Sequence, residues 1–310
     1  MEFRHFSVML RETVDSLKVV PGGIYADGTM GGGGHSYEIL SKGEDVRLIG
    51  IDRDAEAIAA ASKRLEGFGG RFTPVNRNFS EIKYILEELG VEKLDGAVLD
   101  LGVSSYQLDN GERGFSYMQD APLDMRMNRE DPLSAYEVVN NYSQEELTRI
   151  FYEYGEENWS KRVAEFIVEK RKSSAVRTTG ELVDIIKAAI PQKARAEGSH
   201  PAKRIFQAIR IEVNGELRIL RDAVSDFLDV LNPGGRLAVI TFHSLEDRIV
   251  KNVFAEKAKG CVCPKEFPVC VCGKKPEIRT VTRKPILPSE EELGVNSRSK
   301  SAKLRVAEKI

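Results

Sequence analysis

The sequence predicts a doubly wound α/β fold, in which a seven-stranded and mostly parallel sheet is interrupted by a smaller all-helical domain. Two patterns lead to this prediction. Short apolar runs alternate with helical periodicity over the first hundred residues, which is typical of parallel strands joined by helices. From about residue 115 to residue 215 only helical periodicity is found, and the strand pattern then resumes. We therefore expect one domain from residues 1–114 and 216–310, and a helical insert from residues 115–215.

The first four strands are short apolar runs, each followed by a loop and a helical segment or by the insert. Strands are expected at 23–26, 46–51, 72–75 and 94–99, and helices at 36–41, 55–65 and 81–89. Parallel strands joined in this way bring their carboxyl ends to one edge of the sheet, where ligands of such folds bind. The residues that follow these strands are therefore the first candidates for a site.

The insert and the last third of the chain complete the predicted fold. Helices are expected at 144–154, 159–172 and 180–189, and from 201 onward. A helix at 217–231 ends at an Asn-Pro-Gly-Gly turn, which leads into an apolar strand at 236–242. Two further strand candidates, 277–283 and 302–308, would close the sheet as an antiparallel pair.

A glycine-rich loop, DGTMGGGGH at 27–35, follows the first strand. Glycines at a strand-to-helix junction let the backbone approach a nucleotide-type cofactor closely. The loop lacks the Gly-Lys-Ser/Thr ending of a phosphate-binding P-loop. The carboxylate of Asp27 would repel a pyrophosphate, and it suits a cationic cofactor such as S-adenosylmethionine. A NAD(P)-dependent oxidoreductase remains the alternative, favoured by the glycines and by Asp52.

Polar or aromatic residues follow all four of the first strands. Asp52 comes after the second strand, seventeen residues beyond His35, where an acid can accept hydrogen bonds from ribose hydroxyls. Phe79 follows the third strand, and Asp100 ends the fourth. Since Asp27 ends the first strand, we expect these four side chains to meet in one crevice.

Composition and charge restrict the class of protein. The chain has 310 residues, of which 41% are hydrophobic and 30% charged, as in ordinary globular proteins. It has no apolar run near the ~18 residues of a membrane helix and no signal-peptide pattern, so we expect a cytoplasmic protein without membrane contact. Residues 151–310 hold 30 Lys and Arg against 22 Asp and Glu, a basic excess that would suit a polyanion. No obligate protein partner is inferred.

Four cysteines form one cluster, CVCPKEFPVCVC at 261–272. Two Cys-x-Cys pairs could surround a zinc ion, although structural zinc sites usually have Cys-x-x-Cys spacing. The spacing leaves open whether Cys261, Cys263, Cys270 and Cys272 are reduced thiols, form disulfides or bind zinc. We assign no metal ligand from the sequence.

The ordered motifs resemble class I S-adenosylmethionine-dependent methyltransferases and, more closely, the MraW/RsmH family. The matching segments are HFSVML (5–10), DGTMGGGGHS (27–36), GIDRD (50–54), DLGVSSYQLD (100–109), RGFS (113–116), LDMRM (123–127), HPAKR (200–204) and FHSLEDR (242–248). The resemblance covers nearly the whole chain. It implies a Rossmann-like methyltransferase that methylates the exocyclic N4 of a cytidine in the decoding region of 16S rRNA, within a small ribosomal subunit or its precursor.

The resemblance also implies which residues contact S-adenosylmethionine. These are Gly33, Gly34, His35, Asp52, Phe79, Asp100 and Gln107, and Asp27 would add charge complementarity. The glycine backbone can approach the methionine moiety, and Phe79 offers an apolar wall near the adenine. The alternative for Phe79 is ordinary core packing.

The acceptor chemistry can be narrowed from the residues. Methylation at carbon 5 of a pyrimidine needs a cysteine nucleophile, and every cysteine lies in the remote 261–272 cluster. An exocyclic amine instead needs alignment and a hydrogen-bond acceptor. We expect Asp100 and then His243 to be catalytic, although the chain has Asp-Leu-Gly-Val at 100–103 where many amino-methyltransferases have Asp/Asn-Pro-Pro-Tyr/Phe. The alternative for His243 is a satisfied histidine at a strand end.

The target base must be single-stranded or flipped out of a duplex before it can react. Residues that could hold the RNA by hydroxyl, phosphate or stacking contacts are Ser104, Arg113, Phe115, Arg126, Lys203 and Arg204. A second alternative function is a non-catalytic RNA-binding ribosome assembly factor with a vestigial cofactor pocket. The intact acids at 27, 52 and 100 argue against such decay.

Overall fold

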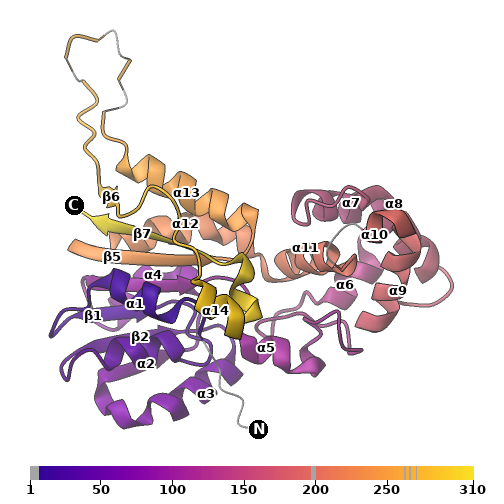
Figure 1. The fold of residues 1–310 in the computed structure, drawn as a ribbon, viewed down its shortest axis with the longest axis horizontal. Coiled ribbons are helices and arrows are strands. Elements are labelled where there is room, and N and C mark those ends of the chain that lie inside the picture. Colours follow the sequence, from indigo (N-terminus) through magenta and orange to yellow (C-terminus); the bar gives the residue numbers. More distant parts are fainter. Residues whose placement is uncertain (1–6, 197–199, 262, 265–266, 270) are drawn as a thin grey trace. The chain divides into compact units, whose positions relative to one another are not determined.

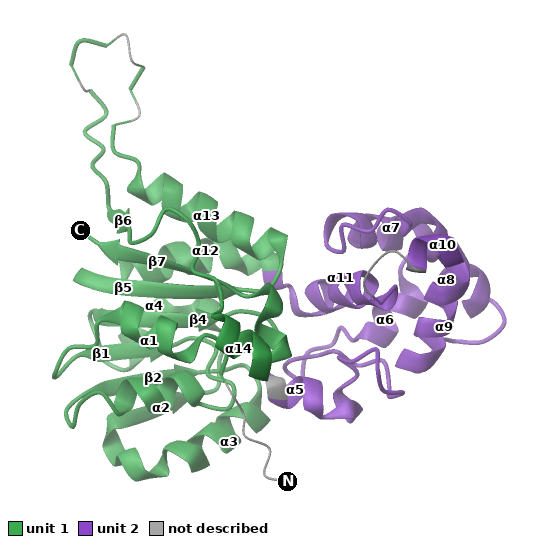
Figure 2. Ribbon diagram, in the orientation of Figure 1, with its two compact units in different colours: residues 1–102, 217–310 green, residues 103–216 purple. Residues whose placement is uncertain are grey.

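The computed structural model describes residues 7–196, 200–261, 263–264, 267–269 and 271–310. The first two residues of the 5–10 motif and Cys270 therefore lie outside the described residues. The chain forms two compact units, which Figure 2 colours separately. Unit 1 contains residues 1–102 and 217–310, and unit 2 contains residues 103–216.

Unit 1 is built on a seven-stranded sheet with the strand order β3-β2-β1-β4-β5-β7-β6 (Figure 1). The strands are β1 (Ile24–Asp27), β2 (Arg47–Ile51), β3 (Phe72–Val75), β4 (Leu94–Asp100), β5 (Leu231–Thr241), β6 (Ile278–Thr280) and β7 (Lys303–Lys309). Strands β1 to β5 pair in parallel, and β7 pairs antiparallel with both β5 and β6. The predicted mostly parallel, seven-stranded sheet with an antiparallel pair at its end is confirmed.

The strand register brings the acids to one edge of the sheet. Asp27 pairs with Gly50 of β2 and with Val98 of β4, so the last residues of these three strands lie close together. The strands are buried on both faces, because helices cover both sides of a parallel sheet. Their apolar residues therefore form continuous runs such as the Leu-Ile-Gly-Ile of β2.

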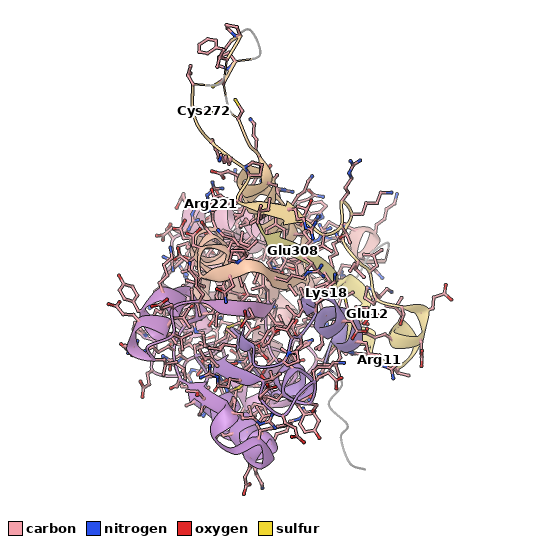
Figure 3. All side chains as sticks on the ribbon, turned by 90° about the vertical axis from the view of Figure 1, so that its left-hand side faces the viewer. Arg11, Glu12, Lys18, Arg221, Cys272 and Glu308 are labelled. Atoms are coloured by element: carbon pink, nitrogen blue, oxygen red, sulfur yellow. The ribbon has the colours of Figure 1, made fainter. Side chains whose placement is uncertain are left out.

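Helices pack on both faces of this sheet. Helices α1 (Leu10–Leu17), α2 (Gly34–Leu40) and α3 (Ala55–Leu65) share one apolar cluster with strand residues. Helices α4 (Ile82–Glu88), α12 (Glu216–Asp229) and α13 (Ser244–Ala258) share the other. Helix α1 buries Val14 and Leu17 and exposes Arg11, as its amphipathic sequence requires (Figure 3).

Two features of unit 1 differ from the sequence prediction. Strand β5 begins at Leu231 rather than at residue 236, because Leu231 already pairs with Leu94 before the register shifts at the Asn-Pro-Gly-Gly segment. Helices α1, α13 and α14 (Glu290–Val295) were not predicted. The residue before α13 is His243, which is not among the usual N-cap residues Ser, Thr, Asp and Asn, so the start signal is weak.

Unit 2 is helical. Its helices are α5 (Ser105–Asp109), α6 (Ala135–Asn141), α7 (Gln144–Glu153), α8 (Ser160–Arg171), α9 (Thr179–Ala189), α10 (Gln192–Ala196) and α11 (Ala202–Asn214). They pack around an apolar core of their own. Within the described part of unit 2, the only β pairing is an isolated bridge between Pro122 and Thr178. No helix among the described residues is long and apolar enough to span a membrane.

Candidate active site

The glycine loop connects β1 to α2 at the carboxyl edge of the sheet. Gly33 has φ +73° and precedes α2, a backbone conformation that favours glycine. A Cβ on Gly28 would lie 2.5 Å from Leu99 Cδ2, so a larger residue cannot fit there. A Cβ on Gly32 would meet nothing within 4 Å. The loop is therefore packed at its start and leaves open space at Gly32.

Asp52 follows β2 and holds the glycine loop through its carboxylate. Its Oδ2 accepts a hydrogen bond from the Gly31 N–H at 2.8 Å, and its Oδ1 accepts one from the Asp54 N–H at 2.9 Å. Burial raises the pKa of Asp52 to about 6. Because each carboxylate oxygen has two lone pairs, Asp52 can still accept bonds from two ligand hydroxyls.

Asp27 is 1% exposed and joins the end of β1 to α2. Its Oδ2 accepts a bond from the Ser36 hydroxyl at 2.7 Å, and its Oδ1 accepts one from the Thr29 N–H at 3.3 Å. Burial raises the pKa of this carboxyl to about 6 as well. With this pKa the Asp27 carboxyl can be protonated or ionised near neutral pH, and a positively charged ligand bound at the loop would favour the ionised form.

Asp100 lies at the end of β4, and its backbone N–H donates to Thr29 Oγ1 at 2.6 Å. Its side chain is 24% exposed, yet Oδ1 is buried and has no hydrogen-bond partner among the described residues. Burial, together with the charges of Asp27, Glu246 and Glu292, raises the pKa of Asp100 well above its usual value. Because a buried acceptor without a partner is unfavourable, this oxygen fits a group that donates a hydrogen bond.

His35 stands beside Asp100 as a neutral side chain. Its Nε2 lies 3.0 Å from the Val8 carbonyl oxygen, so Nε2 carries the proton and donates it. Burial lowers the pKa of His35 to about 4. Its Nδ1 lies 3.9 Å from Asp100 Oδ2, and since the ring is uncharged this contact is not an ion pair.

His243 is the N-cap of α13 and forms a capping box with Glu246. Its Nε2 lies 3.1 Å from Glu246 Oε1, while Glu246 Oε2 accepts from the Phe242 N–H at 2.8 Å. The His243 side chain is 8% exposed. The imidazole therefore caps the first turn of α13 at the carboxyl end of β5, the strand that pairs with β4 and so lies next to Asp100.

Phe79 and Gln107 occupy different surroundings. Phe79 begins the 3₁₀ turn η2 (Phe79–Glu81) after β3, is partly exposed, and packs against the core under α4 and α12. Gln107 belongs to unit 2, is 4% exposed, and forms a capping box with Ser104 at the start of α5. The Gln107 Oε1 accepts from the Ser104 N–H at 3.0 Å.

The basic residues expected to contact RNA all lie in unit 2, and two of the predicted RNA contacts are buried. Arg113 is 1% exposed and donates to the carbonyl oxygens of Arg126 and Met127 at 2.9 and 3.0 Å. Phe115 is 7% exposed and belongs to the helical core. These contacts give Arg113 and Phe115 a packing role, because neither presents its ring or guanidinium group to solvent.

The other three basic residues remain at the surface. Arg126 makes a two-bond contact with the Asp124 carboxylate, with N···O distances of 2.9 and 2.8 Å. Lys203 and Arg204 are exposed in the first turn of α11, and Arg204 Nη1 donates to the Glu156 carbonyl oxygen at 3.0 Å. Lys203 and Arg204 are therefore the most accessible basic pair of the predicted set.

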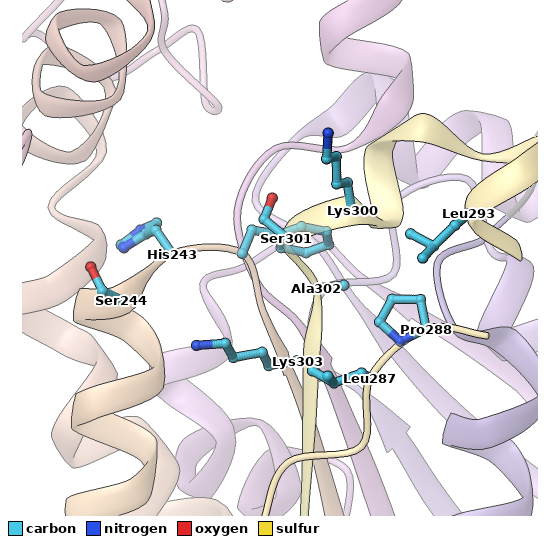
Figure 4. Close-up of a pocket in the computed structure, with 10 residues that line it drawn as sticks. His243, Ser244, Leu287, Pro288, Leu293, Lys300, Ser301, Ala302 and Lys303 are labelled. Atoms are coloured by element: carbon cyan, nitrogen blue, oxygen red, sulfur yellow. The ribbon is translucent and has the colours of Figure 1, made fainter. Parts of the chain in front are cut away.

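A cavity of about 350 Å³ opens beside His243 (Figure 4). The C-terminal segment before β7 and the first residue of β7 form its other wall, with the side chains of Leu287, Pro288, Lys300 and Lys303. Sequence reasoning missed this wall, because only the excess of basic residues in NSRSKSAK at 296–303 distinguishes the segment. The cavity lies within unit 1 and combines apolar and cationic groups.

The fold and this edge of the sheet define a class I S-adenosylmethionine-dependent methyltransferase: a seven-stranded sheet with an antiparallel β7 between β5 and β6, a glycine loop after β1, and acids at the ends of β1 and β4 and after β2. The model of the MraW methylase family matches residues 2–310, and the chain belongs to this family. S-adenosylmethionine is accordingly the cofactor. The open space at Gly32 and the unpartnered oxygen of Asp100 fit a bound group at this edge. Membership in a methylase family rules against the oxidoreductase alternative.

The sequence similarity to known proteins covers the whole chain. The chain is 58% identical to "Ribosomal RNA small subunit methyltransferase H" of Clostridioides difficile (strain 630) and 60% identical to the protein of that name in Clostridium botulinum (strain Loch Maree / Type A3), with 100% of each chain covered in both cases. Among solved structures, a putative rRNA-methylase from Clostridium thermocellum is similar with a TM-score of 0.46 and 13% identity, over 98% of this chain and 99% of that one.

Proposed function

We propose that the protein transfers the methyl group of S-adenosylmethionine to the exocyclic N4 of a cytidine in the decoding region of 16S rRNA. The observation that carries the proposal is Asp100, an acid with a buried oxygen that has no partner among the described residues, at the edge of the sheet that also holds Asp27. The small-subunit methyltransferases at about 60% identity support rRNA as the substrate. We place the reaction on the small ribosomal subunit or its precursor, in the cytoplasm.

The cofactor, when bound, supplies a methyl group activated by a sulfonium charge. In the proposal Asp52 accepts hydrogen bonds from its ribose hydroxyls, and the Gly33 and Gly34 backbone lies along its methionine part. Phe79 contributes the partly exposed apolar surface for the adenine. Asp27 favours positive charge above it, and this charge in turn favours the ionised form of the buried Asp27 carboxyl.

Asp100 is proposed to accept a hydrogen bond from the cytosine amine. The lone pair of this amine is delocalised into the ring, so alignment and a fixed acceptor are needed before the nitrogen can attack a methyl group. As the new N–C bond formed and the sulfur–methyl bond broke, with S-adenosylhomocysteine as the leaving group, the nitrogen would become more acidic, and the carboxylate of Asp100 would take up the proton it loses. A cationic cofactor nearby would lower the raised pKa of Asp100 and supply the ionised form that the step requires.

His243 is proposed as the second residue at the acceptor, through its position on the wall of the 350 Å³ cavity. Its capping contact with Glu246 fixes the ring and suits a positioning role better than proton transfer. Replacement of His243 by Asn, which keeps a capping side chain, should raise KM for the RNA more than it lowers kcat.

Unit 2 is proposed to recognise the RNA. Lys203 and Arg204 offer exposed cations for phosphates, and Arg126 and Ser104 are partly accessible. Arg113 and Phe115 are left out of this surface because their contacts are internal to unit 2. Apart from the flipped cytidine itself, we expect the shape of the folded ribosomal particle and contacts to its phosphates to be the main sources of specificity.

The proposal is tested by incubating small-subunit particles that lack the modification with labelled S-adenosylmethionine. Nucleosides from the 16S rRNA are then separated and identified by mass spectrometry. Label in N4-methylcytidine at one nucleotide is expected. Label in another base atom or a ribose would contradict the proposed acceptor, and tight binding to particles without transfer would favour the non-catalytic assembly factor.

A further inference from the structure

Three cysteine sulfurs lie together on a segment that the proposed methyl transfer does not use. The segment joins α13 to β6 and extends away from the sheet of unit 1, with Cys272 on it (Figure 1 and Figure 3). The Sγ atoms of Cys261, Cys263 and Cys272 all lie within 4.8 Å of one another. Cys270, the fourth cysteine of the motif, lies outside the described residues.

The spacing of the sulfurs matches that of ligands on one tetrahedral ion. Zinc–sulfur bonds of about 2.3 Å at tetrahedral angles place two sulfurs about 3.8 Å apart. The Sγ atoms of Cys261 and Cys272 are 3.8 Å apart. A disulfide would require about 2.05 Å. Cys261 and Cys263 from one end of the segment and Cys272 from the other thus bring their thiols around one point.

Backbone N–H groups point at two of these sulfurs. The Cys263 N–H donates to Cys261 Sγ at 3.4 Å, and the Val271 N–H donates to Cys263 Sγ at 3.3 Å. Such donors stabilise negative charge on sulfur, and metal sites use them to orient thiolate ligands. The arrangement therefore suits thiolates better than neutral thiols.

The segment has little apolar packing to hold it in shape. Phe267, Val269 and Val271 are 51%, 71% and 73% exposed. Ordering a segment costs conformational entropy, and here burial of apolar side chains does not offset that cost. Small elements without a core are commonly stabilised by a structural metal instead.

We propose that Cys261, Cys263 and Cys272 bind a structural zinc ion and so fix the segment between α13 and β6. Thiolates are soft ligands, and a tetrahedral sulfur site selects zinc over the harder magnesium and calcium ions. On binding, each thiol releases its proton to solvent and the sulfur donates an electron pair to the metal. The proposal adds a metal site to a chain for which the sequence alone gave no metal ligand.

The test measures metal bound to the full chain, purified without an affinity tag. Elemental analysis by mass spectrometry should give about one zinc per chain, as a closed structural site requires. Cys272→Ser should lower zinc affinity by about tenfold or more in a competition titration with a chromophoric chelator. Val269→Ser is the matched control, because it places the same side chain at an exposed non-ligand position of the segment, and it should keep the wild-type affinity.

A second measurement does not depend on any variant. Cobalt added to the metal-free wild-type chain should give the intense sulfur-to-metal absorption of a tetrahedral thiolate site. Cys270→Ser, titrated in the same way, reports whether three or four thiolates bind. The proposal is overturned if zinc-supplied protein binds no zinc, if iron is the bound metal, or if the cysteines are recovered as disulfides. Equal zinc affinity of wild type and Cys272→Ser would also overturn it.

Discussion

Replacement of Asp100 by Asn removes a titratable carboxyl and keeps the shape of the side chain. Oδ1 has no hydrogen-bond partner among the described residues, and the link from β4 to Thr29 uses the backbone N–H of Asp100. The fold should therefore tolerate the change. Because burial holds the pKa of Asp100 well above its usual value, stability is lost as pH rises above the ordinary range of an aspartate, and Asp100→Asn should be as stable as wild type or more stable there.

The expected effect on catalysis is large. An amide oxygen still accepts a hydrogen bond from the cytosine amine, but it cannot take up the proton. Loss of a positioned base typically lowers kcat by about a hundredfold, which corresponds to about 3 kcal/mol. The assay is single-turnover methyl transfer to small-subunit particles at saturating cofactor, with calorimetric binding of S-adenosylhomocysteine measured alongside. The affinity for S-adenosylhomocysteine should change much less than kcat.

Asp95→Asn is the matched control, because Asp95 lies at the opposite end of the same strand. Its carboxylate accepts from the Ile24 N–H at 2.8 Å and from Asn232 Nδ2 at 2.9 Å. The control should lose about 1 to 2 kcal/mol of stability and keep its kcat. Turnover of Asp100→Asn within a few-fold of wild type would refute the role assigned to Asp100, and so would an equal loss of kcat in Asp95→Asn.

The remaining predictions concern stability, cofactor binding and RNA binding. Burial raises the pKa of Asp27 from 3.8 to about 6, so the folded state binds this proton more tightly than the unfolded state does. The free energy of unfolding should therefore be highest below pH 3.8 and should decline by about 3 kcal/mol as pH rises through about 6. Urea unfolding of the cofactor-free protein across this range should show the decline, and Asp27→Asn should make it shallower, with the remainder due to Asp52 and Asp100, whose pKa values are also raised; an unchanged slope would contradict the assignment. Gly28→Ala should cost about 2 kcal/mol or more, since its Cβ would lie 2.5 Å from a core leucine. Gly32→Ala, whose Cβ meets nothing within 4 Å, should fold normally yet bind S-adenosylhomocysteine more weakly, and normal affinity would mean that the cofactor does not use this space. Arg113→Ala should cost about 2 to 4 kcal/mol in thermal unfolding because it leaves buried carbonyl groups without donors. Lys203→Ala should instead keep stability and raise KM for the particle with a weaker salt dependence, and the reverse pattern would contradict both placements.

Periodicity and strand order allowed most of unit 1 to be predicted from the sequence. The apolar runs at β1 to β4 are bounded by loops and acids, so their ends, and with them Asp27, Asp52 and Asp100, could be located. The parallel register then places these ends at one edge. The start of β5 was less predictable, because a Pro-Gly-Gly sequence ordinarily marks a turn, and here it forms an irregularity within the strand.

The features that could not be predicted from the sequence depend on contacts between residues far apart in the chain. An arginine in a loop is normally exposed, and only the folded chain brings two carbonyl oxygens to the Arg113 guanidinium group. The cavity beside His243 depends on a C-terminal segment that returns across the sheet from more than forty residues away in the chain. Likewise, Cys-x-Cys spacing did not separate thiols from a metal site, and the zinc proposal rests on the positions of the sulfur atoms, which only the folded chain shows.

The most direct test of the account is a crystal structure of the protein with S-adenosylhomocysteine and a cytidine-containing oligonucleotide. In that structure Asp52 should contact both ribose hydroxyls, and an Asp100 carboxylate oxygen should lie about 3 Å from the N4 of cytosine. An amine held by another side chain, with Asp100 bonded only to the cofactor or to solvent, would contradict the proposed mechanism.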